Sequence, residues 1–303
     1  MRYVLLGLFG LAIATAVALW VVTAPRPAFT ESMAAELEKP GEPARGKVVF
    51  DAGGCASCHA SPGQTDRHRL GGGLALGSPF GTFHVPNISP DRQDGIGAWR
   101  TLDLANALMS GVSPKHQHYY PALPYTDYAH MRVEDARDLM AYLRTLPPVS
   151  GRAPPHELAF PLSVRRFVGL WKLLYLDRSP VKNDPAQSPE WNRGLYLVTA
   201  LDHCGACHSS RNLIGGVEPK TLFAGGPDQD GVGFVPNITP AGIGHWAAAD
   251  LRRALTTGLT PGDRPLGSTM AEVVTDVASL PGDDQQAIVT YIRSLPSRPT
   301  PSP

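Results

Sequence analysis

"DAGGCASCHA", residues 51–60, contains Cys55, Cys58 and His59 in the order C-x-x-C-H. Two cysteines at this spacing begin a zinc knuckle, a redox dithiol, a disulfide pair or a covalent haem attachment site. The pattern occurs a second time in "HCGACHSS", residues 203–210, and the two occurrences together contain all 4 cysteines of the chain. The rest of the sequence has to distinguish between these uses.

The chain repeats itself around the two motifs. Their first cysteines, Cys55 and Cys204, are 149 residues apart (204 − 55). Other segments recur at nearly the same offset: "VPNISP" (85–90) with "VPNITP" (235–240), "GIGAW" (95–99) with "GIGHW" (242–246), and "AYLRTLP" (141–147) with "TYIRSLP" (290–296). A period this long and this constant predicts two copies of one domain rather than a solenoid of short repeats. We place the copies at residues 40–150 and 191–297.

Each copy predicts the same helices in the same order. A short helix leads into C-x-x-C-H, and a second helix follows the tryptophan of the "GIG" segment. A third helix closes each copy; acidic residues open it and a proline stops it, as the helix dipole and the missing proline N–H favour. No segment shows a convincing strand alternation. The sequence therefore predicts a helical fold.

Between the copies lies a proline-rich connector, residues 151–190. It encloses one apolar stretch, "FPLSVRRFVGLWKLLYL" (160–176), with helical spacing, and we place Arg165, Arg166 and Lys172 on its polar side. We expect this helix to pack across the interface of the two domains; the alternative is a contact with a membrane surface. The last residues, 298–303, are expected to be a disordered tail.

The N-terminal segment is apolar. Tyr3–Val22 is 20 residues long without a charged residue, which matches the roughly 30 Å of a bilayer core. Arg2 precedes it, as expected for an N-terminus kept in the cytoplasm. We interpret residues 1–25 as a retained membrane anchor, because the apolar run is longer than the about 7–15 residues of a signal-peptide core. A cleaved signal peptide is the alternative, and both place the following domains outside the cytoplasm.

Charge excludes one class of partner. The chain has 27 basic and 27 acidic residues and no run of Lys or Arg. Nucleic acid binding needs a concentrated basic surface, so we expect no nucleic acid partner.

Haem attachment uses every residue of the two motifs. A structural zinc site separates its C-x-x-C pairs by about 15–20 residues, whereas Cys58 and Cys204 are 146 apart (204 − 58). A thioredoxin-like dithiol needs a βαβ context, which is absent. In a haem site the two thiols add to the two porphyrin vinyl groups, and the adjacent histidine ligates the iron. We therefore predict two covalently bound haem c groups, attached through four cysteines and ligated by two histidines: Cys55, Cys58, His59, Cys204, Cys207 and His208.

The sixth iron ligand decides the redox potential. In the second copy, Met270 stands in a loop 62 residues after His208 (270 − 208) and is the predicted ligand. In the first copy no ligand stands 62 residues after His59, and we predict Met131, just before the closing helix. The competing ligands there are three histidines, and a bis-histidine haem has a lower potential: His116, His118 and His130.

Further residues are expected to support the haems. The carbonyl groups of Pro86 and Pro236 can accept a hydrogen bond from the second ring nitrogen of each axial histidine. Trp99 and Trp246 can donate to a haem propionate, although a repeated tryptophan is more often part of the core.

At this point the chain resembles a known family. The segments "YPALPYTDYA" (120–129) and "WNRGLYLVTALDHCGACHSSRNLIGG" (191–216) are similar to cytochrome c subunits of membrane-bound dehydrogenases, which partner quinoprotein alcohol dehydrogenases and flavin-dependent sugar or gluconate dehydrogenases. The similarity runs from about residue 43 to residue 297. It implies that the motif cysteines attach haem and the motif histidines ligate iron. Many members have Met where this chain has Leu123, and most carry a third haem domain.

Together these patterns predict an all-α fold: two tandem cytochrome c domains of the class I type after an N-terminal transmembrane helix. The predicted function is electron transfer from a periplasmic, membrane-associated dehydrogenase toward quinone or a terminal oxidase, with the haem domains on the periplasmic side of the cytoplasmic membrane. The alternative is an enzyme, a dihaem peroxidase or thiosulfate-type oxidoreductase with substrate at the first haem. No acid–base pair or nucleophilic triad stands out in the sequence, which favours electron transfer.

Overall fold

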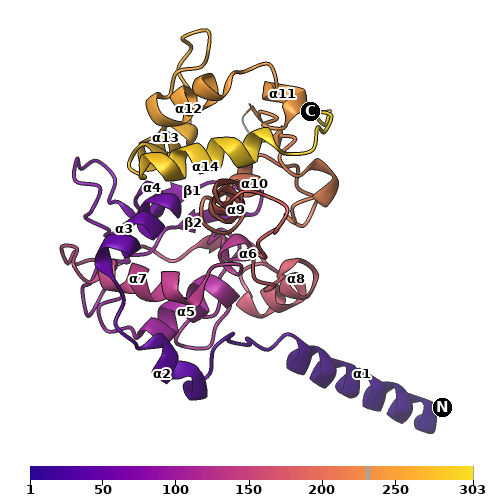
Figure 1. The fold of residues 1–303 in the computed structure, drawn as a ribbon. Helices are drawn as coiled ribbons and strands as arrows, with labels where there is room; N and C mark the ends of the chain where they lie inside the picture. The colour runs from indigo at the N-terminus through magenta and orange to yellow at the C-terminus, as the bar shows by residue number, and fades with distance from the viewer. Residues whose placement is uncertain (230–232, 303) are drawn as a thin grey trace.

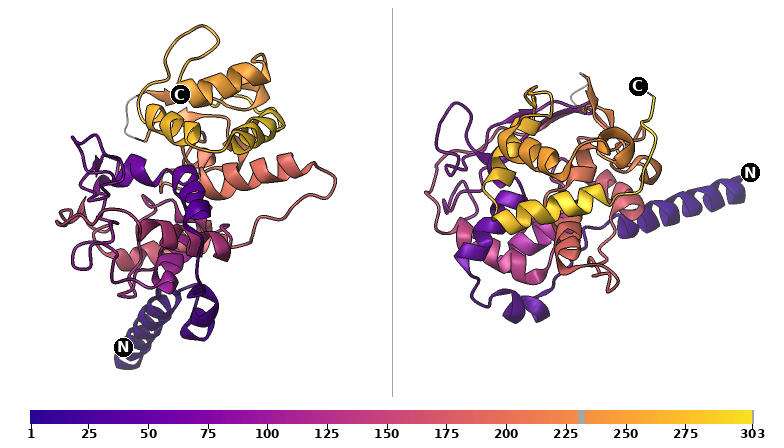
Figure 2. Two further views of the ribbon diagram at one scale, coloured as in Figure 1. Left: turned by 60° about the vertical axis from the view of Figure 1, so that its left-hand side comes forward. Right: turned by 45° about the horizontal axis from the view of Figure 1, so that its top comes forward.

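In the computed structural model, which describes residues 1–229 and 233–302, helices dominate. The N-terminal helix α1 (Arg2–Val22) has no buried residue and extends away from the folded part (Figures 1 and 2). It is the one described helix that is long and apolar enough to cross a membrane. After it, the chain forms two short elements, η1 (Glu31–Met33) and α2 (Ala34–Leu37), before the first copy begins.

The first copy is built on two crossing helices. Helix α3 (Pro43–Ala52) leads into the motif helix α4 (Cys55–His59), and α3 packs against the closing helix α7 (Val133–Leu143). Helices α5 (Thr101–Ser110) and α6 (Tyr125–Tyr128) complete this copy. The predicted leading, middle and closing helices are thus all present.

The second copy repeats this arrangement. Helix α9 (Pro189–Tyr196) continues as one π-helical stretch, η3 (Leu197–Leu201), into the motif helix α10 (Cys204–Cys207). Helix α9 packs against the closing helix α14 (Gly282–Arg293). The other helical elements of this copy are η4 (Pro219–Thr221), α11 (Pro240–Ile243), α12 (Ala248–Thr257) and α13 (Met270–Ala278). In Figure 1 this copy forms the upper part of the molecule and the first copy the lower left part.

Within the described residues, two small antiparallel sheets accompany the helices, and the sequence did not predict them. The first has the order β1-β2-β3, with Ala75 opposite His84 and Gly81 opposite Leu158. Its strands are β1 (Ala75–Leu76), β2 (Gly81–His84) and β3 (Glu157–Leu158), and the second sheet pairs β4 (Gly226–Pro227) with β5 (Phe234–Val235). Strands of 2 to 4 residues are too short to show an alternating pattern.

The connector contacts both copies. It contains η2 (Arg165–Phe167) and α8 (Val168–Tyr175). The Trp171 indole donates to the carbonyl of Ile214 in the second copy at 2.9 Å. Lys172 reaches the first copy, where its Nζ donates to the carbonyls of Ser110 and Gly111 at 2.7 and 2.6 Å. The sequence placed Lys172 on the polar side of this helix, but its amine is buried where α5 ends, so that side of the helix faces the first copy at Lys172.

The C-terminal segment is attached along its first half. The Arg298 backbone N–H donates to Thr239 Oγ1 at 3.2 Å, and Asn237 Nδ2 donates to the Arg298 carbonyl at 2.8 Å. Asn237 Nδ2 also donates to Thr300 Oγ1 at 3.0 Å. The expectation of a free tail over 298–303 is corrected for residues 298–300, and Pro303 lies outside the described residues.

Candidate haem sites

The first C-x-x-C-H segment begins at a glycine in the left-handed region. Gly54 has φ of 58° and precedes α4, so a side chain at this position would be strained. Beyond α4, the Nδ1–H of His59 donates to the carbonyl of Pro86 at 2.8 Å. This bond fixes the orientation of the imidazole ring and leaves Nε2 to bind a metal.

The second segment has the same geometry. The Nδ1–H of His208 donates to the carbonyl of Pro236 at 2.7 Å. His203 takes the place of Gly54, with φ of 43°, and precedes α10. The expected carbonyl acceptors, Pro86 and Pro236, are therefore confirmed in both copies. Because "VPNISP" and "VPNITP" recur with the motifs, the two loops hold equivalent carbonyls.

Burial keeps the groups of both motifs uncharged. It lowers the pKa of His59 to about 4, against the hydrogen bond to Pro86 that raises it. The pKa of His208 is lowered for the same reason. Burial also raises the pKa of Cys58 to about 11 and that of Cys55 further. A neutral imidazole is the form that ligates a metal, whereas a redox dithiol needs a thiol of depressed pKa.

The donor set fits haem c better than zinc. Among residues 1–229 and 233–302, no group of three or more His, Cys, Asp or Glu is arranged to hold a metal ion. The two C-x-x-C pairs thus do not combine into one four-ligand site. Cys55 and Cys58 are not joined by a disulfide. The protonated thiols of Cys55, Cys58 and Cys204 and one oriented neutral imidazole in each motif suit the thioether links and the axial bond of a haem c.

The two predicted methionine ligands lie in different settings. Met270 is the first residue of α13 rather than part of a loop, and it is partly buried at the margin of the core. Met131 follows α6 and is 4% exposed within the core. The repeat offset relates Met131 to Leu280 (280 − 131 = 149), which is also 4% exposed. A leucine at the equivalent position favours a packing role for Met131, and its ligand role stays a prediction.

The competing histidines of the first copy have other partners. His118 Nε2 donates to the carbonyl of Thr23 at 2.9 Å, beside the end of α1. His130 Nδ1 donates to the carbonyl of Ser179 at 2.5 Å, in the connector. His116 is exposed and has φ of 53°. The contacts of His118 and His130 with the end of α1 and with the connector, and the exposure of His116, favour structural and surface roles over iron ligation.

The two tryptophans pack against the core from its margin. Trp99 and Trp246 are both partly buried and pack against the core, as expected for a repeated tryptophan. Trp99 also lines a pocket of about 240 Å³ together with Lys115 and Arg165. The positive charges of this pocket suit carboxylate groups such as propionates.

The two motif segments meet across the contact between the copies, which the sequence did not predict. Asp276 of α13 accepts hydrogen bonds from Ser57, between the cysteines of the first motif, and pairs with Arg67 at 2.9 Å. The Tyr128 hydroxyl of α6 donates to the carbonyl of Gly53 at 2.6 Å. The His203 ring lies 5.8 Å from the Tyr128 ring, edge to face. Each motif segment is therefore in contact with the other copy.

Each copy supplies one acid to this contact, Asp127 partly buried and Asp276 buried. Asp127 interacts electrostatically with His203 of the second motif, while Asp276 binds the first motif. Burial raises the pKa of each carboxyl, against the basic groups nearby that lower it. The signal in the sequence is the offset: "TDYA" and "TDVA" place Asp127 and Asp276 149 residues apart (276 − 127), like the motifs themselves.

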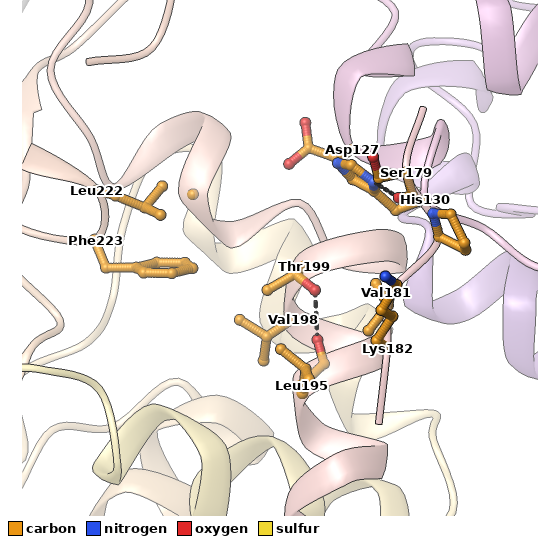
Figure 3. A pocket seen from close by; sticks show the side chains of 12 residues that line it. Asp127, His130, Ser179, Val181, Lys182, Leu195, Val198, Thr199, Leu222 and Phe223 are labelled. Carbon is orange, nitrogen blue, oxygen red and sulfur yellow. Dashed lines mark hydrogen bonds between the residues drawn. The ribbon is translucent and has the colours of Figure 1, made fainter. Parts of the chain in front are cut away.

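A pocket of about 460 Å³ adjoins the second motif segment. Figure 3 shows apolar side chains on one side and at the centre, and Asp127 and His130 of the first copy on the other. Its apolar lining comes from Leu195, Val198, Val181, Leu222 and Phe223, and Gly205 of the motif also borders it. An apolar pocket with a few polar groups at one edge is the usual setting of a bound cofactor.

Comparison with known proteins agrees with this geometry. Residues 43–147 match the family model of cytochrome c. A "Diheme cytochrome c-type" protein of Cereibacter sphaeroides is 48% identical over 85% of this chain and 87% of its own length. The "Fructose dehydrogenase cytochrome subunit" of Gluconobacter japonicus is 36% identical over 94% of this chain and 58% of its own length.

A further relative is the cytochrome c subunit of "Alcohol dehydrogenase (quinone)" from Gluconacetobacter polyoxogenes, which is 33% identical over 84% of this chain and 56% of its own length. The chain thus spans a little over half of these two dehydrogenase subunits and most of the diheme protein. The covalent attachment of haem c is implied by the cytochrome c family. On the strength of the diheme relative and the matching motif geometry, this chain belongs to the cytochrome c family.

Proposed function

We propose that the chain is a dihaem c-type cytochrome with two tandem cytochrome c domains, at residues 40–150 and 191–297. In this proposal Cys55 and Cys58 attach one haem and His59 ligates its iron. Cys204, Cys207 and His208 do the same for the second, with Met270 as its sixth ligand. The name of the Cereibacter sphaeroides relative supports the number of haems, and the repeated His-to-Pro hydrogen bonds support equivalent sites.

The function that this arrangement supports best is electron transfer. Bound haem supplies a one-electron carrier whose potential depends on the axial ligands and the surrounding dielectric. The chain's own residues orient the two imidazoles and bury the motif segments. The observation that carries the proposal is the contact of the two motif segments through Ser57, Asp276, Tyr128 and His203. A path between two carriers within one chain needs such a contact.

We propose that the electrons come from a dehydrogenase at the periplasmic face of the cytoplasmic membrane and pass to quinone or a terminal oxidase. Relatives are named as cytochrome subunits of fructose, alcohol and gluconate dehydrogenases, which supports a dehydrogenase as donor. Helix α1 supplies the membrane anchor. With this orientation the haem domains lie on the side of the membrane where c-type haems are attached.

The test is purification of the full chain from its native membranes with an affinity tag, followed by substrate-driven reduction of its haems. The expected result is a co-purified dehydrogenase whose substrate reduces both haems under anaerobic conditions, and a resting spectrum with two low-spin haems. A ferric high-spin band, with cyanide or peroxide binding at the first haem and peroxide turnover, would instead establish a dihaem enzyme and contradict the proposal.

A further inference from the structure

Helix α8 of the connector has one buried and one exposed apolar face. Val168 and Gly169 are buried, and the buried amine of Lys172 lies on the same side. Large apolar side chains on the other side and just before the helix are exposed, and we call them the connector patch: Phe160, Val164, Phe167, Leu170, Leu173 and Leu174. Single exposed apolar residues are normal on a protein surface, whereas several together mark an interaction site.

The connector patch is part of an amphipathic helix. Phe167, Leu170 and Leu174 follow one another at spacings of three and four, which places them on one stripe of a helix. Leu174 is 69% exposed and Phe160 is 78% exposed. The described residues of the chain therefore leave most of the surface of Leu174 and Phe160 uncovered.

Helix α8 is fixed to the end of α1. Gly169 lies so close to Thr23 that a Cβ on the glycine would be 2.5 Å from the Thr23 carbonyl oxygen. Arg166 Nε donates to Thr23 Oγ1 at 3.1 Å, and its guanidinium carbon lies 4.0 Å from the centre of the Trp20 ring. Figure 1 and the right-hand view of Figure 2 both show the connector helix beside the end of α1 that joins the folded part.

This attachment sets the depth of α8 relative to a bilayer. The 21 residues of α1 are about 31 Å long at 1.5 Å per residue, which equals the hydrocarbon thickness of about 30 Å. Thr23 then lies at the membrane boundary, and Trp20 lies where interfacial tryptophans gather. Because Gly169 contacts Thr23, α8 lies at the same level.

The charge of the connector suits a lipid surface. Residues 160–184 contain five basic residues and two acidic ones, Asp177 and Asp184, in a chain with no net charge. Four of them can face a lipid surface, Arg165, Arg166, Arg178 and Lys182, whereas the amine of Lys172 is buried against the first copy. An apolar stripe flanked by basic residues is typical of helices that lie in the headgroup region of anionic membranes.

We propose that the connector patch is a second membrane contact, inserted at the boundary of headgroups and acyl chains beside α1; this rests on the proposed function, in which α1 is the membrane anchor. The occupant is lipid rather than a protein partner, because the covalent link and the Thr23–Gly169 contact already hold α8 at the bilayer surface. Such a contact fixes the orientation of the folded part toward the membrane, which a single helix with an exposed linker would leave free.

The test uses the full chain, loaded with haem, in lipid nanodiscs of phosphatidylethanolamine and phosphatidylglycerol. A photoreactive residue is introduced as Leu174→p-benzoylphenylalanine, with Leu11→p-benzoylphenylalanine in α1 as the positive control. Thr257→p-benzoylphenylalanine, at the exposed end of α12, is the negative control. After illumination, lipid adducts are measured by mass spectrometry. We expect adducts at Leu174 and Leu11 and none above background at Thr257.

A second variant tests whether the connector patch is inserted into the lipid or only lies near it. This variant carries Leu173→Glu and Leu174→Glu, with the photoreactive residue placed at Phe160. Lipid adducts at Phe160 should fall by roughly threefold or more, because the added charges oppose insertion into the membrane. An unchanged haem spectrum shows that the variant is folded. Absence of lipid adducts at Leu174 while Leu11 reacts would overturn the proposal. So would adducts at Leu174 in native membranes that join it to a protein and never to lipid.

Discussion

The two copies of the repeat differ by one residue in the helical segment that leads from the helix crossing to the C-x-x-C-H motif. In the first copy Gly46 precedes Cys55 by nine residues (55 − 46); in the second, Gly194 precedes Cys204 by ten (204 − 194). Both glycines lie at a helix crossing, and a Cβ would be 1.9 Å from the Asp138 carbonyl or 2.0 Å from that of Ala287. The π-helical stretch Leu197–Leu201 absorbs the extra residue. The helix crossing and the motif are therefore kept in both copies, and the segment between them varies in length.

The copies differ more in the segments that contain the predicted sixth ligands than in the segments around the axial histidines. Met270 of the second copy corresponds by the repeat offset to Pro121 (270 − 121 = 149), and Met131 of the first to Leu280. The proximal side, with its His-to-Pro hydrogen bond, is the same in both. If each motif holds a haem as proposed, this difference predicts a common attachment and separate potentials for the two haems.

The largest effect is expected at the helix crossings. Gly46→Ala and Gly194→Ala each force a methyl group into a backbone carbonyl, and should lower the free energy of unfolding by about 3 kcal/mol or more through overpacking. Gly262→Ala is the matched control, because nothing lies within 4 Å of its added Cβ. Denaturant unfolding of the full chain in detergent measures all three. Equal stability of Gly46→Ala and the control would show that the helix crossing has room for the added methyl group.

The ligand difference is tested by the two methionines. Met270→Ala should abolish the near-infrared band of methionine ligation at one haem and lower its potential by on the order of 0.1 V, since axial ligands set haem potentials over about 0.8 V. Met131→Leu should leave spectrum and potentials unchanged, because Leu280 fills the equivalent place in the other copy. A lost band or a lowered potential in Met131→Leu would instead establish Met131 as the sixth ligand.

Much of this comparison was predictable from the sequence, and the reasons are local. The leading and closing helices follow from apolar spacing, acidic first turns and terminal prolines, and the carbonyl acceptors from loops that recur with the motifs. The π-helical stretch, the buried Lys172 and the bond from Ser57 to Asp276 depend on contacts between distant segments. No local pattern encodes these contacts, although the shared offset of Asp127 and Asp276 indicates that both are part of the repeat.

A smaller effect is expected at the contact between the copies. Asp276→Asn removes the charge that pairs with Arg67 and weakens the bond from Ser57, both largely buried, and should cost about 1–3 kcal/mol of unfolding free energy. Asp263→Asn is the control, because the Asp263–Arg253 pair is exposed and such pairs contribute about 0–1 kcal/mol. Should both variants unfold alike, the motif segments are not held together by Asp276.

A pH dependence of stability is also expected from the connector. Burial lowers the pKa of Lys172 from 10.5 to about 7. Between these values the unfolded chain binds more protons than the folded one, so stability rises with pH from about 7 toward 10.5. The same stability is lost as the pH falls from 10.5 to about 7. Lys172→Met should remove that dependence. The measurement is the unfolding midpoint of both proteins at pH 7 and pH 9.5; parallel curves would contradict the lowered pKa.

The most direct measurement counts the covalent haems. The full-length protein is denatured in acid and extracted with organic solvent, and its intact mass and pyridine haemochrome spectrum are then recorded. Two attached copies with equivalent motif geometry predict that no porphyrin is extracted and that the chain carries the mass of two haems. Extraction of porphyrin, or a mass with fewer than two additions, would contradict the assignment of one haem to each motif.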